Sequence, residues 1–303
     1  MLDHAGPAIL PTPAAPPAAA GDPVAPDPAW VIGKYGLLNV EGVVRDGRTV
    51  LEPRSWRIPY QWQGYHYQDH DDEPFLPLVN SSGGFVEGDV SHLTARLGSG
   101  TRTLITTTAA SKFYKCLEGG TSHEIVEIRV ADDAALEYCP DESIPFADSR
   151  VRRITRLALA PSARLFATDM ISAGRVHYRD GECFRFTSLF SEFEVRVAGR
   201  PLVIDRLVAE DPATVAALPR LWRGALHMAT VLSYAPDLPP GIEEQLAGIV
   251  VEGTELGATR IGQLAVLRIL SVETWQAHEA LYRAWEVLRP PIMGKPARPI
   301  RKC

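Results

Sequence analysis

Residues 91–115 read SHLTARLGSGTRTLITTTAASKFYK, and this stretch decides the fold class. Apolar and polar residues tend to alternate on both sides of G-S-G at 98–100, and this is the period of a half-buried β-strand. Glycine and serine are residues that tight turns favour. The stretch therefore predicts a strand, a turn and a second strand.

The same scheme of strand, polar turn and strand recurs in four other segments. They are 37–56 with a turn at Asp46-Gly47, 123–140 with a turn at Asp132-Asp133, 153–171 with a turn at Pro161-Ser162, and 184–210. Short strands at this spacing are typical of stacked or sandwiched sheets, and the spacing shows no repeat of fixed period.

The pattern changes in the last third of the chain. Residues 223–234 and 258–271 each predict a strand, and residues 241–253 predict a helix. The clearest helix is predicted over 271–291, where apolar side chains recur on one face and Pro290-Pro291 forms the expected end.

We therefore predict a mainly β protein of stacked or sandwiched sheets with a smaller C-terminal α+β portion. Residues 1–29 are rich in alanine and proline, and such a segment buries too little apolar area to order itself, so we predict a disordered tail. Residues 30–206 form the predicted β-rich body, and residues 207–303 the predicted C-terminal portion packed on it.

Composition excludes several classes of protein. The chain has 303 residues, 46% of them hydrophobic, a mean hydropathy of -0.05 and a formal net charge of -6. The charge argues against a nucleic-acid or anionic-membrane surface, and no apolar run is long enough to span a bilayer. The 4 cysteines lie far apart without a C-x-x-C pair, and the N-terminus lacks a secretory pattern, so we predict a cytoplasmic protein.

Residues 80–89, NSSGGFVEGD, raise the question of a phosphate-binding loop. A phosphate loop needs backbone N–H groups and a lysine, but here Glu87 and Asp89 place two carboxylates where the anion would lie. A tight turn is one alternative, because Gly83, Gly84 and Gly88 adopt backbone angles that other residues avoid. The other alternative is that the two carboxylates face a cation.

Two further groups have the residue types of a reactive site. Thr106, Thr107 and Thr108 carry hydroxyls, but no pattern of basic partners accompanies them, so strand packing is favoured over nucleophilic catalysis. The segment HYQDHDD places His66 and His70 among acids, which suits nickel, zinc or iron, although a solvated surface patch is favoured. The corresponding alternative function is a β-rich metal-dependent hydrolase that uses these two histidines and nearby carboxylates.

Several stretches in order along the chain resemble one family. They are NSSGGFVEGD at 80–89, LGSGTRTLITTTAASKFYK at 97–115, LEYCPDESIPFADSR at 136–150, GRPLVIDRL at 199–207 and WEVLRPPIMGKPA at 285–297. The set resembles the urease accessory protein UreD, also called UreH, from about Trp30 to Ala297. The chain departs from the family pattern at its PIRKC ending and in its Pro-rich tail.

The resemblance implies a protein that is not an enzyme and that acts as a scaffold and metallochaperone component. It implies a β-rich fold, the partners UreF, UreG and apo-urease, and help in delivering nickel to urease along a proposed water-filled route. It implies no tightly bound cofactor, only transient Ni²⁺. An interaction module with no metal role is a third alternative.

A protein that passes a metal ion onward is expected to hold it through exchangeable oxygen ligands rather than in a closed cage. We predict a hydrated nickel passage lined by carboxylates in or beside the family-like motifs, namely Glu87, Asp89, Glu137, Glu142, Asp148 and Glu182. The remaining motif residues are predicted to be structural or, for Lys112 and Tyr114, to lie in strand-end packing or an interface. They are Gly83, Gly84, Gly88, Thr107, Thr108, Lys112, Tyr114, Pro140, Arg289, Pro290 and Gly294.

Overall fold

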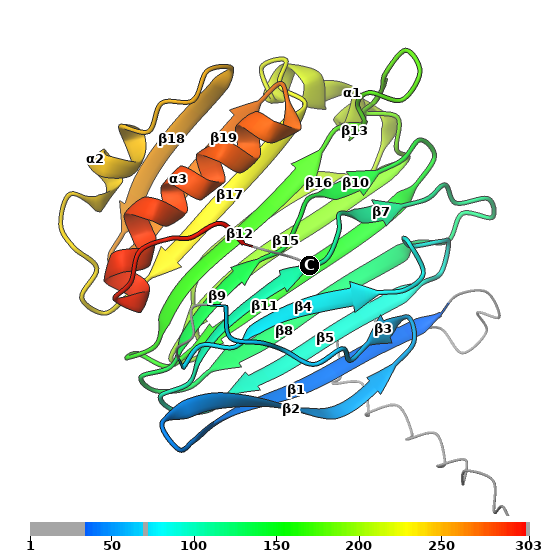
Figure 1. Cartoon of the computed structure of the whole chain (residues 1–303). Coiled ribbons are helices and arrows are strands. Elements are labelled where there is room, and N and C mark those ends of the chain that lie inside the picture. Colours follow the sequence, from blue (N-terminus) through cyan, green and yellow to red (C-terminus); the bar gives the residue numbers. More distant parts are fainter. Residues whose placement is uncertain (1–33, 69–71, 301–303) are drawn as a thin grey trace, which may run out of the picture. The chain divides into compact units, whose positions relative to one another are not determined.

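The computed structural model describes residues 34–68 and 72–300. In this part of the chain, most strands belong to two large sheets that pack face to face, and a long helix covers the outer face of one sheet (Figure 1). The mainly β fold predicted from the sequence is therefore confirmed. The predicted tail at 1–29 and His70 lie outside the described residues.

The first sheet has seven strands, of which the five central ones run parallel and the two edge strands antiparallel to them. In spatial order they are β16 (Arg200–Ala209), β15 (Ser188–Val197), β11 (Arg150–Leu159), β8 (Ser122–Val130), β5 (Val90–Leu97), β1 (Tyr35–Arg45) and β2 (Arg48–Arg57).

The second sheet is larger and mixed, with its central strands β12, β9, β6 and β4 in parallel. In spatial order it contains β18 (Thr254–Ile261), β19 (Leu264–Ser271), β17 (His227–Tyr234), β12 (Arg164–Ser172), β9 (Ala135–Cys139), β6 (Arg102–Thr107), β4 (Phe75–Asn80) and β3 (Tyr60–Gln61). The short strand β10 (Ser143–Pro145) joins β12 to β7 (Ser111–Phe113), and β13 (Gly174–Arg175) pairs with β14 (Glu182–Cys183).

The chain passes back and forth between the two sheets. The predicted pairs at 37–56 and 184–210 are antiparallel neighbours, β1 with β2 and β15 with β16. In the three middle segments the two strands do not pair with each other: β5 and β6, β8 and β9, and β11 and β12 lie in different sheets. This arrangement buries the apolar face of both strands of a segment in one core between the sheets, instead of joining them edge to edge.

Strands of the larger sheet are buried on both faces. Leu76, Ile105 and Leu136 pack into the core between the sheets, while Phe75 and Leu104 pack toward the helices on the other face. Burial of both faces explains why β17 is apolar or small along nearly its whole length, and why β6 lacks the alternation predicted for it and buries four consecutive residues, 103–106.

Several elements after residue 211 differ from the sequence prediction. The helix α1 (Pro212–Leu221) was not predicted, although Asp211 and Thr214 form a capping box at its start. The helix predicted at 241–253 is shorter, as α2 (Ile242–Ala247). The single strand predicted at 258–271 is instead the hairpin of β18 and β19, because Gly262 at φ +60 permits a turn there.

The long helix α3 (Thr274–Met293) does not end at Pro290-Pro291 as predicted, but continues to Gly294, whose φ is +71. Proline removes a helical N–H donor, which costs most in a helix interior. In this last turn the carbonyls of both prolines still accept hydrogen bonds. Gly294 N–H donates to Pro290 O at 2.8 Å, and Arg164 Nη1 donates to Pro291 O at 2.9 Å.

The C-terminal part of the chain continues the larger sheet. Strand β17 hydrogen-bonds to β12, and the predicted boundary between residues 206 and 207 falls inside β16. The division into a body and a C-terminal portion stays a prediction. Among the described residues, the helices are too short or too polar to cross a membrane.

Candidate functional site

The loop after β4 uses its glycines for backbone geometry. Gly83 and Gly88 have φ values of +73 and +77, and a Cβ on Gly84 would lie 2.7 Å from Lys112 O. Lys112 O instead accepts the Phe85 N–H at 2.7 Å, and Tyr114 Oη donates to Gly83 O at 3.3 Å. A side chain at Gly84 would collide with Lys112 and push the backbone of residues 83–85 away from that of residues 112–114.

The carboxylates of the same loop bind backbone N–H groups. Glu87 accepts from Leu117 N–H at 2.6 Å, from Glu118 N–H at 2.9 Å and from Gly120 N–H. These hydrogen bonds, chiefly the one from the Glu118 N–H, lower the pKa of Glu87. Asp89 accepts from Lys34 N–H at 2.7 Å and from Val86 N–H at 3.0 Å, so both carboxylates hold chain segments in place.

Replacing Glu87 by glutamine is expected to loosen the loop at 116–120. The neutral amide of glutamine has one acceptor oxygen where the carboxylate has two. Its NH₂ group would face the backbone N–H donors of the loop and cannot accept hydrogen bonds from them. The pKa of Glu87 is lower in the folded protein than in the unfolded chain. Ionised Glu87 therefore stabilises the fold fully at a pH above the unfolded-state pKa, and this stabilisation is lost as the pH falls through the folded-state pKa. Amide hydrogen exchange of Leu117 and Gly120 should be faster in the variant at neutral pH. The difference should shrink in acid, and equal protection at neutral pH would contradict this role.

Glu137 is fully buried and belongs to an ionic cluster under α3. Its carboxylate accepts from Trp285 Nε1 and from Arg289 Nε at 3.1 Å, and Arg289 Nη2 also reaches Glu73 at 3.1 Å. Lys295 pairs with Glu73 as well. Burial raises the pKa of Glu73, and the neighbouring negative charge of Glu137 raises it further. The positive charge of Lys295 opposes this rise.

Asp148 and Glu182 lie near the hairpin of β13 and β14. Glu182 accepts from Ala147 N–H at 2.8 Å and from Arg175 Nε at 2.9 Å, and the bond from Arg175 lowers the pKa of Glu182. Asp148 has φ +61, and its backbone bonds to Cys116 and Arg185. The six predicted carboxylates are thus distributed over separate places, and a passage lined by Glu87, Asp89, Glu137, Glu142, Asp148 and Glu182 stays a prediction.

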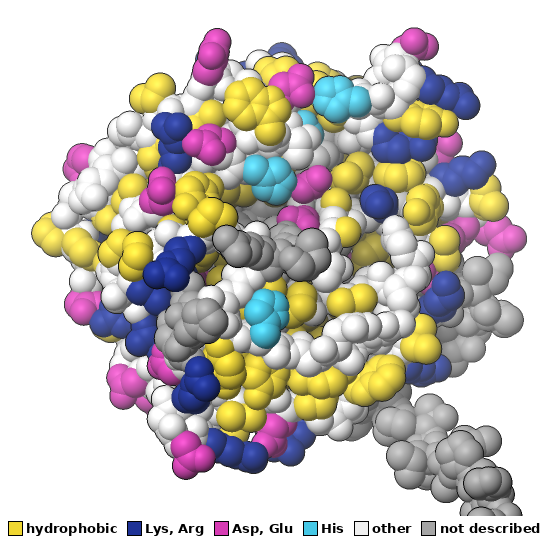
Figure 2. Space-filling view, viewed as in Figure 1, with side chains coloured by type: hydrophobic (Ala, Val, Ile, Leu, Met, Phe, Trp, Pro, Cys, Tyr) yellow, Lys and Arg dark blue, Asp and Glu magenta, His cyan; other side chains and the backbone are white. Residues whose placement is uncertain are grey.

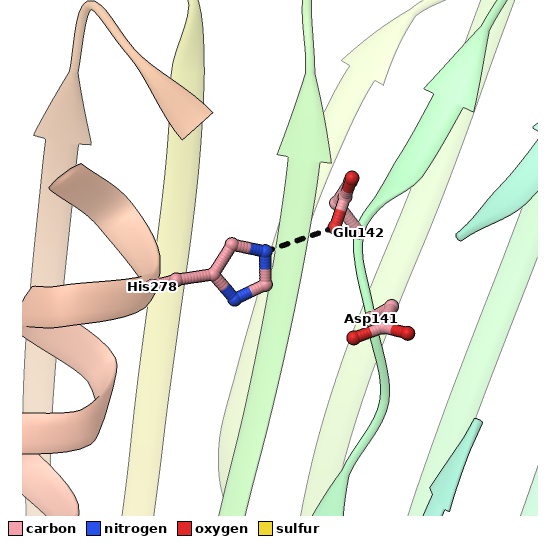
Figure 3. Close-up of side chains that lie close together, drawn as sticks. All are labelled: Asp141, Glu142 and His278. Atoms are coloured by element: carbon pink, nitrogen blue, oxygen red, sulfur yellow. Dashed lines mark hydrogen bonds and ion pairs between the residues drawn. The ribbon is translucent and has the colours of Figure 1, made fainter. Parts of the chain in front are cut away.

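Glu142 is the predicted carboxylate that lies close to other side chains of metal-ligating types in the described part of the chain. Its Oε2 lies 3.1 Å from Nε2 of His278, and ligand atoms of Asp141, Glu142 and His278 all lie within 4.8 Å of one another (Figure 3). The two carboxylates lie on the connection between β9 and β10, and His278 lies near the start of α3. Among residues 34–68 and 72–300, this is the one group of three donors close enough to hold a metal ion.

The backbone around this group is fixed by neighbouring strands. Asp141 N–H donates to Thr107 Oγ1 at 2.8 Å, and Ser111 N–H donates to Glu142 O at 2.9 Å. Burial acts to raise the pKa of Glu142, but the hydrogen bond with His278 holds it below its usual value. The carboxylate is therefore ionised at neutral pH, and two carboxylates with one imidazole suit a divalent transition metal.

A pocket opens beside these donors. It has a volume of about 240 Å³ and lies between α3, the end of β9 and the middle of β12. Its lining is mostly apolar and includes two of the three donors, Asp141 and His278; the lining residues are Cys139, Pro140, Asp141, Phe166, Thr168, His278, Leu281, Tyr282, Trp285 and Ile300. On the face seen in Figure 2, histidine and acidic side chains lie close together near the start of α3. An ion bound here would keep positions open to water.

A second polar group lies between the two sheets and was not predicted. Arg153 donates from Nε to Glu124 at 2.9 Å, from Nη2 to Asp169 at 2.7 Å and from Nη1 to Ser191 at 3.3 Å. Glu124 borders a cavity of about 90 Å³, and Asp169 and Ser191 border another of about 120 Å³. The second cavity also holds Asp205, which pairs with Arg268 at 2.7 Å.

The other candidate reactive groups have structural contacts. Thr106 Oγ1 donates to Cys139 O, and Thr108 Oγ1 donates to Leu78 O at 3.3 Å, as strand residues do. The His66 ring packs on Phe75 with ring centroids 4.8 Å apart. Because His70 lies outside the described residues, the metal-dependent hydrolase stays a prediction.

Comparison with known proteins places the chain in one family. The family model described as UreD urease accessory protein matches residues 34–302. A urease accessory protein UreD of Alkalilimnicola ehrlichii is 33% identical over 296 residues, which is 96% of each chain. UreD of Klebsiella pneumoniae is 32% identical over 82% of this chain and 87% of its own length, and UreD 2 of Methylorubrum extorquens 28% identical over 88% and 89%. The chain therefore belongs to the UreD family of urease accessory proteins.

Proposed function

We propose that this chain helps to deliver nickel to apo-urease, in the cytoplasm and together with UreF and UreG, and that it catalyses no reaction itself. Membership of the UreD family supports a role in urease maturation. The observation that carries the nickel role is the group of Asp141, Glu142 and His278, because oxygen and imidazole donors suit Ni²⁺.

The geometry of this group favours an exchangeable site. The side chain of His278 is 44% exposed and that of Glu142 is 15% exposed, so water reaches the donors. Three protein ligands leave coordination positions to water or to a donor from another protein. A metal ion in such a site can leave by ligand exchange, whereas a closed cage of four protein ligands would retain it. Nickel is the cargo in this proposal, and Glu142 is the predicted passage residue that contacts it.

The test is urease activation in a host that carries the urease structural and accessory genes. With the gene for this chain omitted, urease should be folded but poor in nickel, and restoring the gene should return both nickel content and activity. Restoring the gene with the substitution Glu279→Gln should return nickel content and activity as well. Glu279 lies next to His278 in the chain, but it pairs with Arg283 on the exposed face of α3. Full nickel loading without the gene would overturn the proposal.

A further inference from the structure

Aromatic and arginine side chains form one stacked column beside the hairpin of β13 and β14. The rings of Tyr114 and Phe146 meet edge to face, with their centroids 5.1 Å apart. The guanidinium of Arg175 lies 4.3 Å from the centre of the Phe146 ring and 3.7 Å from the centre of the Tyr178 ring. The guanidinium of Arg179 lies 5.1 Å from the same Tyr178 ring. We call these five residues the aromatic column.

The aromatic column is held in place by the fold and still reaches solvent. Glu182 accepts from Arg175 Nε at 2.9 Å, and Tyr114 Oη donates to Gly83 O at 3.3 Å. Tyr178 nevertheless remains 40% exposed. Tyrosine and arginine are among the residue types that contribute most to binding at protein interfaces. Because these side chains are already fixed, they lose little conformational entropy when a partner binds.

Basic side chains lie on the segments beside the column. Backbone hydrogen bonds place three of these segments side by side, because Cys116 N–H donates to Asp148 O and Asp148 N–H donates to Arg185 O, both at 3.0 Å. The side chains of Lys115 and Arg185 are exposed on these segments, and that of Arg150 is half-buried. The three cations therefore border a single part of the surface.

This part of the surface is basic, although the whole chain carries a net charge of -6. Figure 2 shows Lys and Arg side chains gathered with hydrophobic ones near β7, β10 and β13. The basic residues here are Lys112, Lys115, Arg150 and Arg185. The exposed acids of the same segments are Glu118 and Asp148, since backbone N–H groups engage the carboxylate of Glu87. A local excess of positive charge attracts a negatively charged partner.

We propose that the aromatic column and these basic residues form a docking surface for an acidic surface of a partner protein. The column supplies apolar contact at the centre, and Lys115, Arg150 and Arg185 pair with carboxylates of the partner around it. A protein is favoured over nucleic acid, because nucleic-acid binding depends on cations that neutralise many phosphates. The inference rests on the proposed function only for the identity of the partner, which is UreF, UreG or apo-urease.

The experiment isolates the tagged full-length chain from a host that carries the urease structural and accessory genes, and it quantifies the UreF, UreG and urease subunits that are recovered. In the variant Lys115→Glu with Arg185→Glu, recovery of one of these proteins should fall at least about tenfold, because like charges then face each other. Tyr178→Ala should reduce recovery of the same protein by at least about tenfold, as loss of an interface anchor does. Raising NaCl from about 0.1 M to about 0.5 M should also release that protein from the parent chain.

A matched variant controls for the change in net charge. Arg129→Glu with Arg200→Glu reverses two exposed arginines at the opposite end of the first sheet, and this variant should recover all three proteins. Unchanged melting temperatures and near-ultraviolet circular dichroism show that the variants are folded.

Two results would overturn the inference. One is recovery of all three proteins at the parental level by Lys115→Glu with Arg185→Glu and by Tyr178→Ala. The other is loss of the partner from the parent chain after nuclease treatment, which would indicate that nucleic acid occupies the surface. Either result leaves the proposed function standing, because that function fails only if urease acquires its nickel without this chain.

Discussion

Replacing Arg153 by methionine is expected to destabilise the protein by about 3–5 kcal/mol, the cost of leaving buried charges without their partner. The Arg153 side chain is 6% exposed, and it joins Glu124 of β8 to Asp169 of β12 across the space between the sheets. Burial opposes the charged guanidinium, but Asp169 and Glu124 raise the pKa of Arg153 above its ordinary value. Without Arg153 two carboxylates would face each other in the interior.

Denaturant-induced unfolding measures this effect. Arg283→Met is the matched control, because Arg283 pairs with Glu279 on the exposed face of α3 and such pairs contribute only about 0.5 kcal/mol. Neutralising both acids in the background of Arg153→Met, with Glu124→Gln and Asp169→Asn, should restore part of the lost stability. A loss below about 1 kcal/mol for Arg153→Met would contradict a buried role for this charge.

Replacing Arg289 by methionine is expected to cost a similar 3–5 kcal/mol and to release the segment after α3. Arg289 separates the buried carboxylates of Glu73 and Glu137, and its guanidinium lies 4.5 Å from the centre of the Trp285 ring. Arg289 Nη1 also donates to Pro296 O at 2.9 Å. The variant therefore loses an ion-pair cluster and an anchor of the C-terminal segment together.

Two measurements separate these consequences. Unfolding by denaturant reports the lost stability, and limited proteolysis reports release of the segment from Lys295 onward. Arg298→Met serves as the control for cleavage, because it changes an arginine within the segment itself. If Arg289→Met kept both the stability and the protease resistance of the parent, the cluster would not anchor the segment.

The strands could be predicted from sequence, but not their distribution between sheets. A period-two run marks β5 clearly, and Asp46-Gly47 marks the hairpin of β1 and β2. A short turn, however, has the same residues whether it reverses a strand within one sheet or crosses to the other. The choice is made by burial of both strands in the core between the sheets, which involves residues far apart in the chain.

The candidate site shows the same limit. Asp141 and Glu142 lie within the motif at 136–150, and Glu142 was predicted to line a hydrated nickel passage. His278 joins them from 136 residues away, and nothing local in the helix distinguishes it from a histidine on a solvated face. Glu124, Asp169 and Asp205 were missed as well. Charged residues at inward positions of alternating strands are the signal that could have found them.

We propose that nickel reaches urease by way of Asp141, Glu142 and His278. The most direct test measures the nickel content of urease matured with the triple variant Asp141→Asn, Glu142→Gln and His278→Ala in place of the parent chain. We predict urease that lacks most of its nickel, although the variant is folded and is still isolated with UreF. Urease with a full complement of nickel, matured by that variant, would contradict the account.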